Sequence, residues 1–150
     1  MYRKIEMASA VLLLLGIVLL VGIASVSRAV GSPIIWSVEI AQLLFVWLCM
    51  LAADIALQDG RHFGLLILLD NLSPNIRRLF EIFNLVVLMA LLLLLFTYAW
   101  KNAILMHPRL IGATQMHASL VHASMVVGLA LLMRTMGIQL FNKIRQKADI

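Results

Sequence analysis

The chain has 150 residues, of which 63% are hydrophobic and only 13% are charged. Soluble domains carry charges at about a quarter of their positions, so this chain has too little polar surface to cover itself in water and is predicted to be an integral membrane protein. The net charge of +5 does not indicate nucleic-acid binding, because the basic residues stand at the ends of apolar runs and form no basic face with interleaved aromatic residues.

The first apolar run extends from Met7 to Ser27, after a basic N-terminus and before Arg28. A bilayer core of about 30 Å needs about 20 helical residues, so this run is long enough to cross it. A signal peptide is the alternative, but its apolar core would span about 7–15 residues and would end at a small-residue cleavage site. We therefore expect an uncleaved membrane-spanning helix.

Three further spans are predicted along the chain. The second covers residues 34–58 and follows Pro33, which is favoured in the first turn of a helix. The third covers residues 82–100, which contain no charged residue, and the fourth covers residues 111–133. Four spans joined by short links predict an all-α integral membrane protein, with residues 1–150 forming a single transmembrane domain.

The link between the second and third spans contains a shorter apolar segment. Its core, residues 63–69, is too short to cross a bilayer and is flanked by Arg61, His62 and Asp70. Such a segment is typical of a helix that lies near the lipid headgroups. We expect a short interfacial helix over residues 61–72, with a shallow re-entrant turn as the alternative.

Lysine and arginine residues fall unevenly on the two sides of these spans. Nine of the twelve lie at the chain termini and in the link between the second and third spans, on one side. Arg28, Lys101 and Arg109 lie on the other side. Because cytoplasmic segments carry the basic excess, both termini are predicted to face the cytoplasm.

The predicted second span carries two carboxylates, Glu39 and Asp54. A charged side chain inside a membrane costs a few kcal/mol and usually has a partner or a function. Fifteen residues of helix place the two acids about 60° apart around the axis and about 22 Å apart along it. We favour a structural interpretation, in which each acid meets a base near one membrane surface, over a proton or cation pathway, which would lack intermediate acids. The candidate bases are Lys101 and Arg109 for Glu39, and Arg61, Arg77 and Arg134 for Asp54.

Further polar side chains extend this pattern along the same helix. Gln58 lies one turn beyond Asp54, Gln42 lies nearly one turn beyond Glu39, and Trp47 stands between them on much the same side. A polar stripe on a membrane helix indicates a protein neighbour, within this chain or on a partner.

Two histidines in the predicted fourth span, His117 and His122, raise the possibility of haem ligation. Five helical residues separate them by about 140° around the axis, so they could not ligate one iron together, and we expect packing histidines and no cofactor. The sequence also lacks a Gly-rich phosphate loop, an HExxH pair and a GxSxG elbow. We therefore expect no enzyme, with a haem-binding membrane anchor as one alternative function.

One block of the sequence has a recognisable order of features: a tryptophan, an acid, an aliphatic stretch around a second tryptophan, a small pair, a charged link with a histidine, and an apolar segment ending near an acid and a proline. This order resembles the small, Q-type membrane subunit of tripartite ATP-independent periplasmic (TRAP) transporters. The features fall on Trp36, Glu39, Trp47, Ala52, Ala53, Arg61, His62, Asp70 and Pro74.

The fourth span is also similar to the last segment of that family, with Gly128 and Arg134 in register. The chain departs from the family pattern at a few positions. Prolines and aromatic residues are common in the family where this chain has His117, Ser119 and His122, and an arginine is common where Gln42 stands.

The resemblance implies a fixed scaffold in the bacterial inner membrane beside a larger, many-span M-type subunit, in a 1:1 pair. That subunit would hold the sodium and substrate sites, and a periplasmic binding protein would deliver the substrate, commonly a carboxylate. The small subunit itself would carry no catalytic, substrate or metal site, and membrane lipids would surround it. A self-sufficient homodimeric carrier is the second alternative function. The candidates for packing against partner helices are Trp36, Glu39, Gln42, Trp47, Asp54, Gln58, Arg61, His62 and Arg134.

Overall fold

The structure, a computed structural model, describes residues 2–58 and 74–145. The interfacial helix expected over residues 61–72, with the candidate residues Arg61 and His62, lies outside the described residues.

Four long α-helices make up most of the described chain: α1 (Tyr2–Ala29), α2 (Trp36–Gln58), α4 (Pro74–Leu105) and α5 (Ser119–Arg145). Each is long and apolar enough to cross a membrane. The structure therefore confirms the prediction of an all-α, multi-pass membrane protein with four spanning helices.

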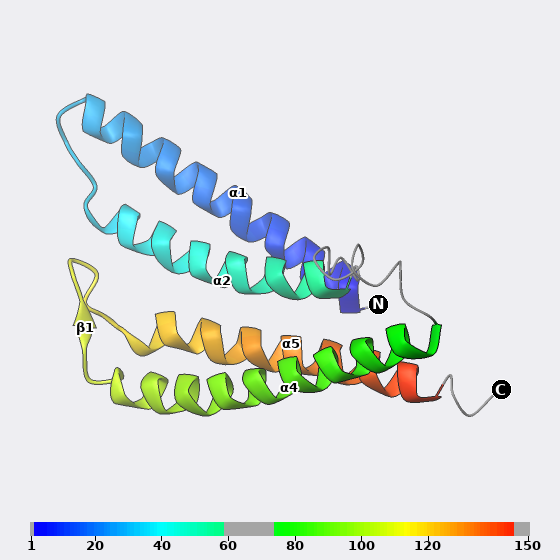
Figure 1. Cartoon of the computed structure of the whole chain (residues 1–150). Helices are drawn as coiled ribbons and strands as arrows, with labels where there is room; N and C mark the ends of the chain where they lie inside the picture. The colour runs from blue at the N-terminus through cyan, green and yellow to red at the C-terminus, as the bar shows by residue number, and fades with distance from the viewer. Residues whose placement is uncertain (1, 59–73, 146–150) are drawn as a thin grey trace.

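The helices form two hairpins that lie side by side (Figure 1). One hairpin joins α1 to α2 and the other joins α4 to α5, and the main contact between the hairpins is between α2 and α5. The order across the molecule is thus α1, α2, α5, α4. α1 begins and α5 ends at the same end of the molecule, which we call the Asp54 end (Figure 1). The opposite end, where α2 begins, is called the Glu39 end.

The apolar core is thin and is concentrated in the second hairpin. Leu85 and Ala99 of α4 and Leu129 and Met136 of α5 are among the few buried apolar residues of the described chain. By contrast, the most apolar stretch of α1 has no buried residue, and large side chains such as Leu12 are 69% exposed. Such a surface suits contact with lipid tails or with another membrane protein.

α1 ends at a glycine cap. Gly31 has a φ of +84°, a conformation that L residues rarely adopt. The amide of Gly31 donates to the carbonyl of Arg28, and the amide of Ser32 donates to that of Ser27. This Schellman pattern satisfies two of the last carbonyls of the helix and turns the chain toward α2.

α2 and α5 approach each other closely at Gly128. A Cβ atom at this position would lie 2.6 Å from the Cβ and 2.7 Å from the Sδ of Met50. Small residues allow membrane helices to pack at such short separations, so Gly128 sets the spacing between the two hairpins.

A short β-hairpin precedes α5, with strands β1 (Leu110–Ile111) and β2 (Met116–His117). The strands are antiparallel, and Leu110 pairs with His117. The predicted start of the fourth span at residue 111 is therefore wrong, because helix begins at Ser119. Beyond the predicted span the same helix extends to Arg145. In the sequence, the apolar residues of the hairpin resemble the start of a membrane helix. The hairpin is held instead by a contact with Glu39 on α2, which lies far away in the chain.

Candidate functional site: polar contacts at the two ends of the helices

At the Asp54 end, a buried carboxylate joins α2 to α5. Asp54 is fully buried. The hydroxyl of Thr135 on α5 donates to Asp54 Oδ1 at 2.7 Å, and the amide of Gln58, one turn along α2, donates to Oδ2 at 2.8 Å. Arg134 Nη2 lies 3.7 Å from Oδ2. Both carboxylate oxygens thus have partners, as a buried charge requires.

Glu6 brings α1 into the same cluster. Arg134 Nη2 donates to Glu6 Oε1 at 2.7 Å, and Gln58 Nε2 donates to Glu6 Oε2 as well as to Asp54. Glu6 is 9% exposed. Three helices therefore meet through side chains, and we call this cluster, formed by Glu6, Asp54, Gln58, Arg134 and Thr135, the Asp54 clamp.

The geometry of the Asp54 clamp indicates a role in holding the helices in place. An exposed ion pair adds about 0–1 kcal/mol to stability, whereas removing one partner of a buried pair costs about 3–5 kcal/mol because a charge is left unsatisfied. Asp54 belongs to the second class, because it is fully buried and bonded across two helices. The clamp therefore favours one alignment of α1, α2 and α5 over others.

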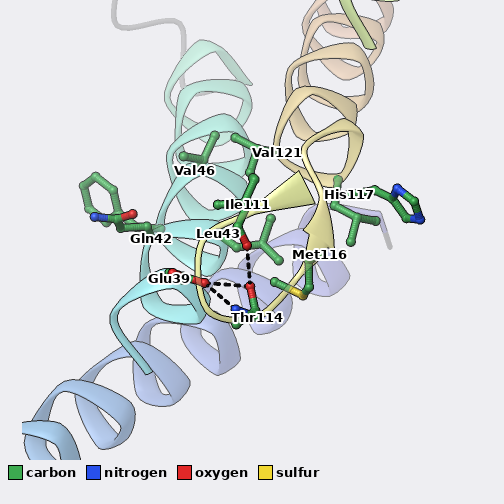
Figure 2. A pocket seen from close by; sticks show the side chains of 11 residues that line it. Glu39, Gln42, Leu43, Val46, Ile111, Thr114, Met116, His117 and Val121 are labelled. Atoms are coloured by element: carbon green, nitrogen blue, oxygen red, sulfur yellow. Dashed lines mark hydrogen bonds between the residues drawn. The ribbon is translucent and has the colours of Figure 1, made fainter. Parts of the chain in front are cut away.

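At the Glu39 end, the carboxylate of Glu39 binds the tip of the β-hairpin (Figure 2). The amide of Ala113 donates to Glu39 Oε1 at 2.7 Å. The amide and hydroxyl of Thr114 donate to Oε2 at 2.9 and 2.7 Å. Successive backbone N–H groups in a turn form a concave site for an anion. We call this contact of Glu39 with Ala113 and Thr114 the Glu39 latch.

Gly112 completes the latch by leaving room for the carboxylate. A Cβ atom on Gly112 would collide with Oε1 of Glu39, and the residue has a φ of +42°. Both observations require glycine at this position.

The two acids meet different kinds of partner from those expected. Arg134, one of three candidate bases, does lie near Asp54, but the short hydrogen bonds come from the neutral Thr135 and Gln58. Arg77, another candidate, pairs with Glu81 at 3.2 Å. These contacts agree with the structural interpretation of Asp54.

For Glu39 the expected ion pairs are wrong. Within the described part of the chain its partners are Ala113 and Thr114, not Lys101 or Arg109. Lys101 Nζ instead lies 5.9 Å from the centre of the Tyr98 ring. Backbone amides take the place of a base because the turn brings two of them to one carboxylate.

The remaining candidates do not join either cluster. Trp36 is 48% exposed and Gln42 is also exposed, while Trp47 is half-buried. Gln42 borders a cavity of about 420 Å³ between α2 and the β-hairpin, and Figure 2 shows its side chain on the side of α2 away from the hairpin. The structure thus brings Asp54, Gln58 and Arg134 together and binds Glu39 to the β-hairpin, while Trp36, Gln42 and Trp47 lie outside both contacts.

Four residues of these contacts, Glu6, Thr135, Ala113 and Thr114, were not among the sequence candidates, and Ala113 contributes only its backbone amide. Glu6 lies just before the first apolar run, and its opposite charge to Arg134 is a weak signal that the two could pair across the bundle. Thr135 follows Arg134 directly, but a lone threonine in an apolar helix gives no signal. Thr114 acts partly through its backbone, which no side-chain pattern reveals.

The described histidines, His107, His117 and His122, lie near the Glu39 end on separate elements. His117 is on β2, so the predicted 140° offset from His122 on one helix does not apply. The His107 and His117 rings stack at 4.7 Å, and His117 Nδ1 lies 2.8 Å from the carbonyl oxygen of His107. His122 Nδ1 lies 3.2 Å from the amide of Asn102. Among the described residues, no group of three or more His, Cys, Asp or Glu side chains is placed to hold a metal ion.

Between the two clusters the described helices are free of charged residues. Positions 7–27, 40–53, 82–100 and 119–133 contain no Asp, Glu, Lys or Arg. The charged contacts are therefore confined to the two ends of the helices, where they can fix the helices without placing a charge at mid-depth.

Comparison with known families agrees with this picture. The model of the family described as "Tripartite ATP-independent periplasmic transporters, DctQ component" matches residues 17–146, which include all of α2, α4, α5 and the β-hairpin. No protein of curated function matches the sequence. The match covers most of the chain, so the protein belongs to the DctQ family and is the small permease subunit of a TRAP transporter.

Proposed function

We propose that this DctQ-family subunit is a fixed scaffold for a larger, M-type membrane subunit, with which it forms a 1:1 pair. The large subunit would hold the sodium and substrate sites, and the substrate would be a carboxylate-type solute delivered by a periplasmic binding protein. Family membership supports the association with both partners.

The observation that carries the scaffold role is the position of the polar contacts. The Asp54 clamp and the Glu39 latch hold the helices at opposite ends, and no charged residue lies between them in the described helices. Transporters usually place substrate and coupling ions near the middle of the membrane, on interrupted helices. α1, α2, α4 and α5 are continuous, which suits a subunit that supports a moving partner.

The orientation follows from charge. At the Asp54 end the described helices carry Arg3, Lys4, Arg77, Arg134 and Arg145, whereas Arg28, Lys101 and Arg109 lie toward the Glu39 end. Because basic residues are enriched on the cytoplasmic side, we infer that the Asp54 end and both termini face the cytoplasm of a bacterial cell. The Glu39 latch then lies at the periplasmic surface, where the binding protein delivers substrate.

A transport assay with an Asp54→Asn variant tests the scaffold role. The variant should lower the amount of assembled complex and the total uptake, while the number of sodium ions per substrate in the remaining transport stays unchanged. Glu81→Gln, at the i,i+4 pair with Arg77, is the matched control and should leave both quantities near wild type.

A changed sodium stoichiometry with normal assembly would contradict the proposal, because it would place Asp54 in the coupling machinery. The two alternative functions, a homodimeric carrier and a haem-binding anchor, are favoured by no observation on the described residues. Transport by vesicles that contain this chain alone would support the homodimeric carrier, and a haem absorption band in the purified chain would support the haem-binding anchor.

A further inference from the structure

α1 and α2 separate toward the Glu39 end and leave a groove between them. Figure 1 shows the two helices close together where α1 begins and far apart where it ends. The groove has a volume of about 510 Å³ and is lined by residues from the last three turns of α1 and the first three turns of α2. Small side chains, including Ala24 and Ala41, form part of its wall.

Two polar groups face this groove without a partner in the described part of the chain. Arg28 stands at its mouth, at the C-terminal end of α1, and its guanidinium has no hydrogen bond or ion pair with any described residue. Gln42, also in its lining, likewise has no hydrogen-bond partner among those residues. An amide or guanidinium at the level of a membrane interface needs a polar partner, because an unsatisfied group near hydrocarbon is costly.

The rest of the lining is apolar. Ile17 and Val21 from α1 and Phe45 from α2 border the groove below the two polar groups, and Phe45 is 56% exposed. The groove thus offers a cation at its mouth, an amide donor about two helical turns below the start of α2, and an apolar wall beyond them. This order matches a glycerophospholipid, which has a phosphate, then ester carbonyls, then an acyl chain.

We propose that the groove between α1 and α2 binds one glycerophospholipid. Its phosphate pairs with Arg28, an ester carbonyl accepts a hydrogen bond from the Gln42 side-chain amide, and one acyl chain lies along Val21 and Phe45. The lipid fills the gap that the separating helices leave and supports α1, which the Asp54 clamp holds only at the other end.

The proposal is tested by native mass spectrometry of the full chain, purified in mild detergent and titrated with phosphatidylglycerol. The wild type should retain one lipid. Arg28→Gln should weaken its binding about fivefold, the change that corresponds to about 1 kcal/mol for one basic residue at an anionic lipid surface. Lys101→Gln is the matched control, because Lys101 is an exposed cation near the same end of the bundle, on α4, outside the groove; it should bind lipid as the wild type does.

A second variant separates the groove from the charge. Ala24→Phe fills the groove and keeps Arg28, so it should also lower lipid retention. Equal retention by wild type, Arg28→Gln and Ala24→Phe would show only non-specific lipid and would overturn the proposal. A photoreactive residue at position 45 that captured another polypeptide in native membranes would overturn it too, because a protein helix would then occupy the groove.

Discussion

The Asp54 clamp and the Glu39 latch use the same chemical group in two different ways. Asp54 is fully buried and is bound by side chains from α2 and α5, with α1 joined through Glu6. Glu39 is half-buried and is bound mainly by the backbone of one turn. The first contact depends on the identity of several side chains, and the second depends on one side chain and the shape of a loop.

This difference predicts how the two ends respond to change. The Asp54 clamp fixes whole helices against each other, so its loss should affect the entire fold. The Glu39 latch fixes a short hairpin to the start of α2, so its loss should act locally. The variants below test this contrast, from the largest expected effect to the smallest.

The matched variants Asp54→Asn and Glu39→Gln should show the largest difference in the free energy of unfolding. In Asp54→Asn an NH₂ group can face the Thr135 or Gln58 donors, and Arg134 loses a neighbouring charge. We expect the free energy of unfolding to fall by about 3 kcal/mol, the upper end of the cost of leaving buried hydrogen-bonding groups unsatisfied, as measured by denaturant titration in mild detergent. Glu39→Gln should lower it clearly less. An equal or larger loss of unfolding free energy for Glu39→Gln would contradict the expected difference between the Asp54 clamp and the Glu39 latch.

A second pair of variants tests the packing between the two ends. Gly128→Ala places a Cβ against the Cβ of Met50, and overpacking of this kind costs about 1–3 kcal/mol. Gly22→Ala is the control, since a Cβ there meets nothing within 4 Å and alanine favours helix. Thermal unfolding in detergent should show a lowered Tm for Gly128→Ala and an unchanged or raised Tm for Gly22→Ala. The same Tm for both would mean that α2 and α5 are not in close contact.

The same type of substitution, threonine to valine, can be made in both the Asp54 clamp and the Glu39 latch. Thr135→Val removes a hydroxyl donor from the buried Asp54. We expect the free energy of unfolding to fall by about 1–2 kcal/mol, a value between those for a hydrogen bond to a charged group and for a hydrogen bond between membrane helices. Thr114→Val removes a donor from Glu39 but leaves the amides of Ala113 and Thr114 in place. Its effect on unfolding should be smaller, and the reverse order would show that the hydroxyl, not the backbone, holds the latch.

The smallest effect is local and needs a local probe. In Glu39→Gln the side chain keeps one acceptor oxygen, so the amides of Ala113 and Thr114 should exchange hydrogen faster while amides in α4 keep their protection. Gly112→Ala should give the same result, because its Cβ displaces the carboxylate. Hydrogen exchange by mass spectrometry resolves this region. Unchanged exchange in both variants would contradict the latch.

The sequence predicted the four helices because each is a long apolar run with charges at its ends, and a bilayer imposes that pattern. It also predicted a base near Asp54, since Arg134 follows the last apolar run. Charges at the ends of spans are informative because few other arrangements can satisfy them.

The β-hairpin and the Glu39 latch could not be predicted in the same way. Residues 110–117 contain enough apolar side chains to resemble the start of a helix, and the donors that bind Glu39 are mainly backbone amides, which every residue except proline possesses. Glu6 was missed for a related reason: its partners lie on α2 and α5, 52 and 128 positions away. Contacts of this kind depend on how the helices meet, which local pattern does not specify.

The most direct test of the scaffold role is to purify the tagged chain from its native membrane in mild detergent and to identify the proteins that accompany it by mass spectrometry. We predict one large, many-span membrane protein in equal amount with the wild type, and a reduced amount with Asp54→Asn. If the wild-type chain is recovered alone, or only with copies of itself, the proposal that it supports a larger transport subunit is contradicted.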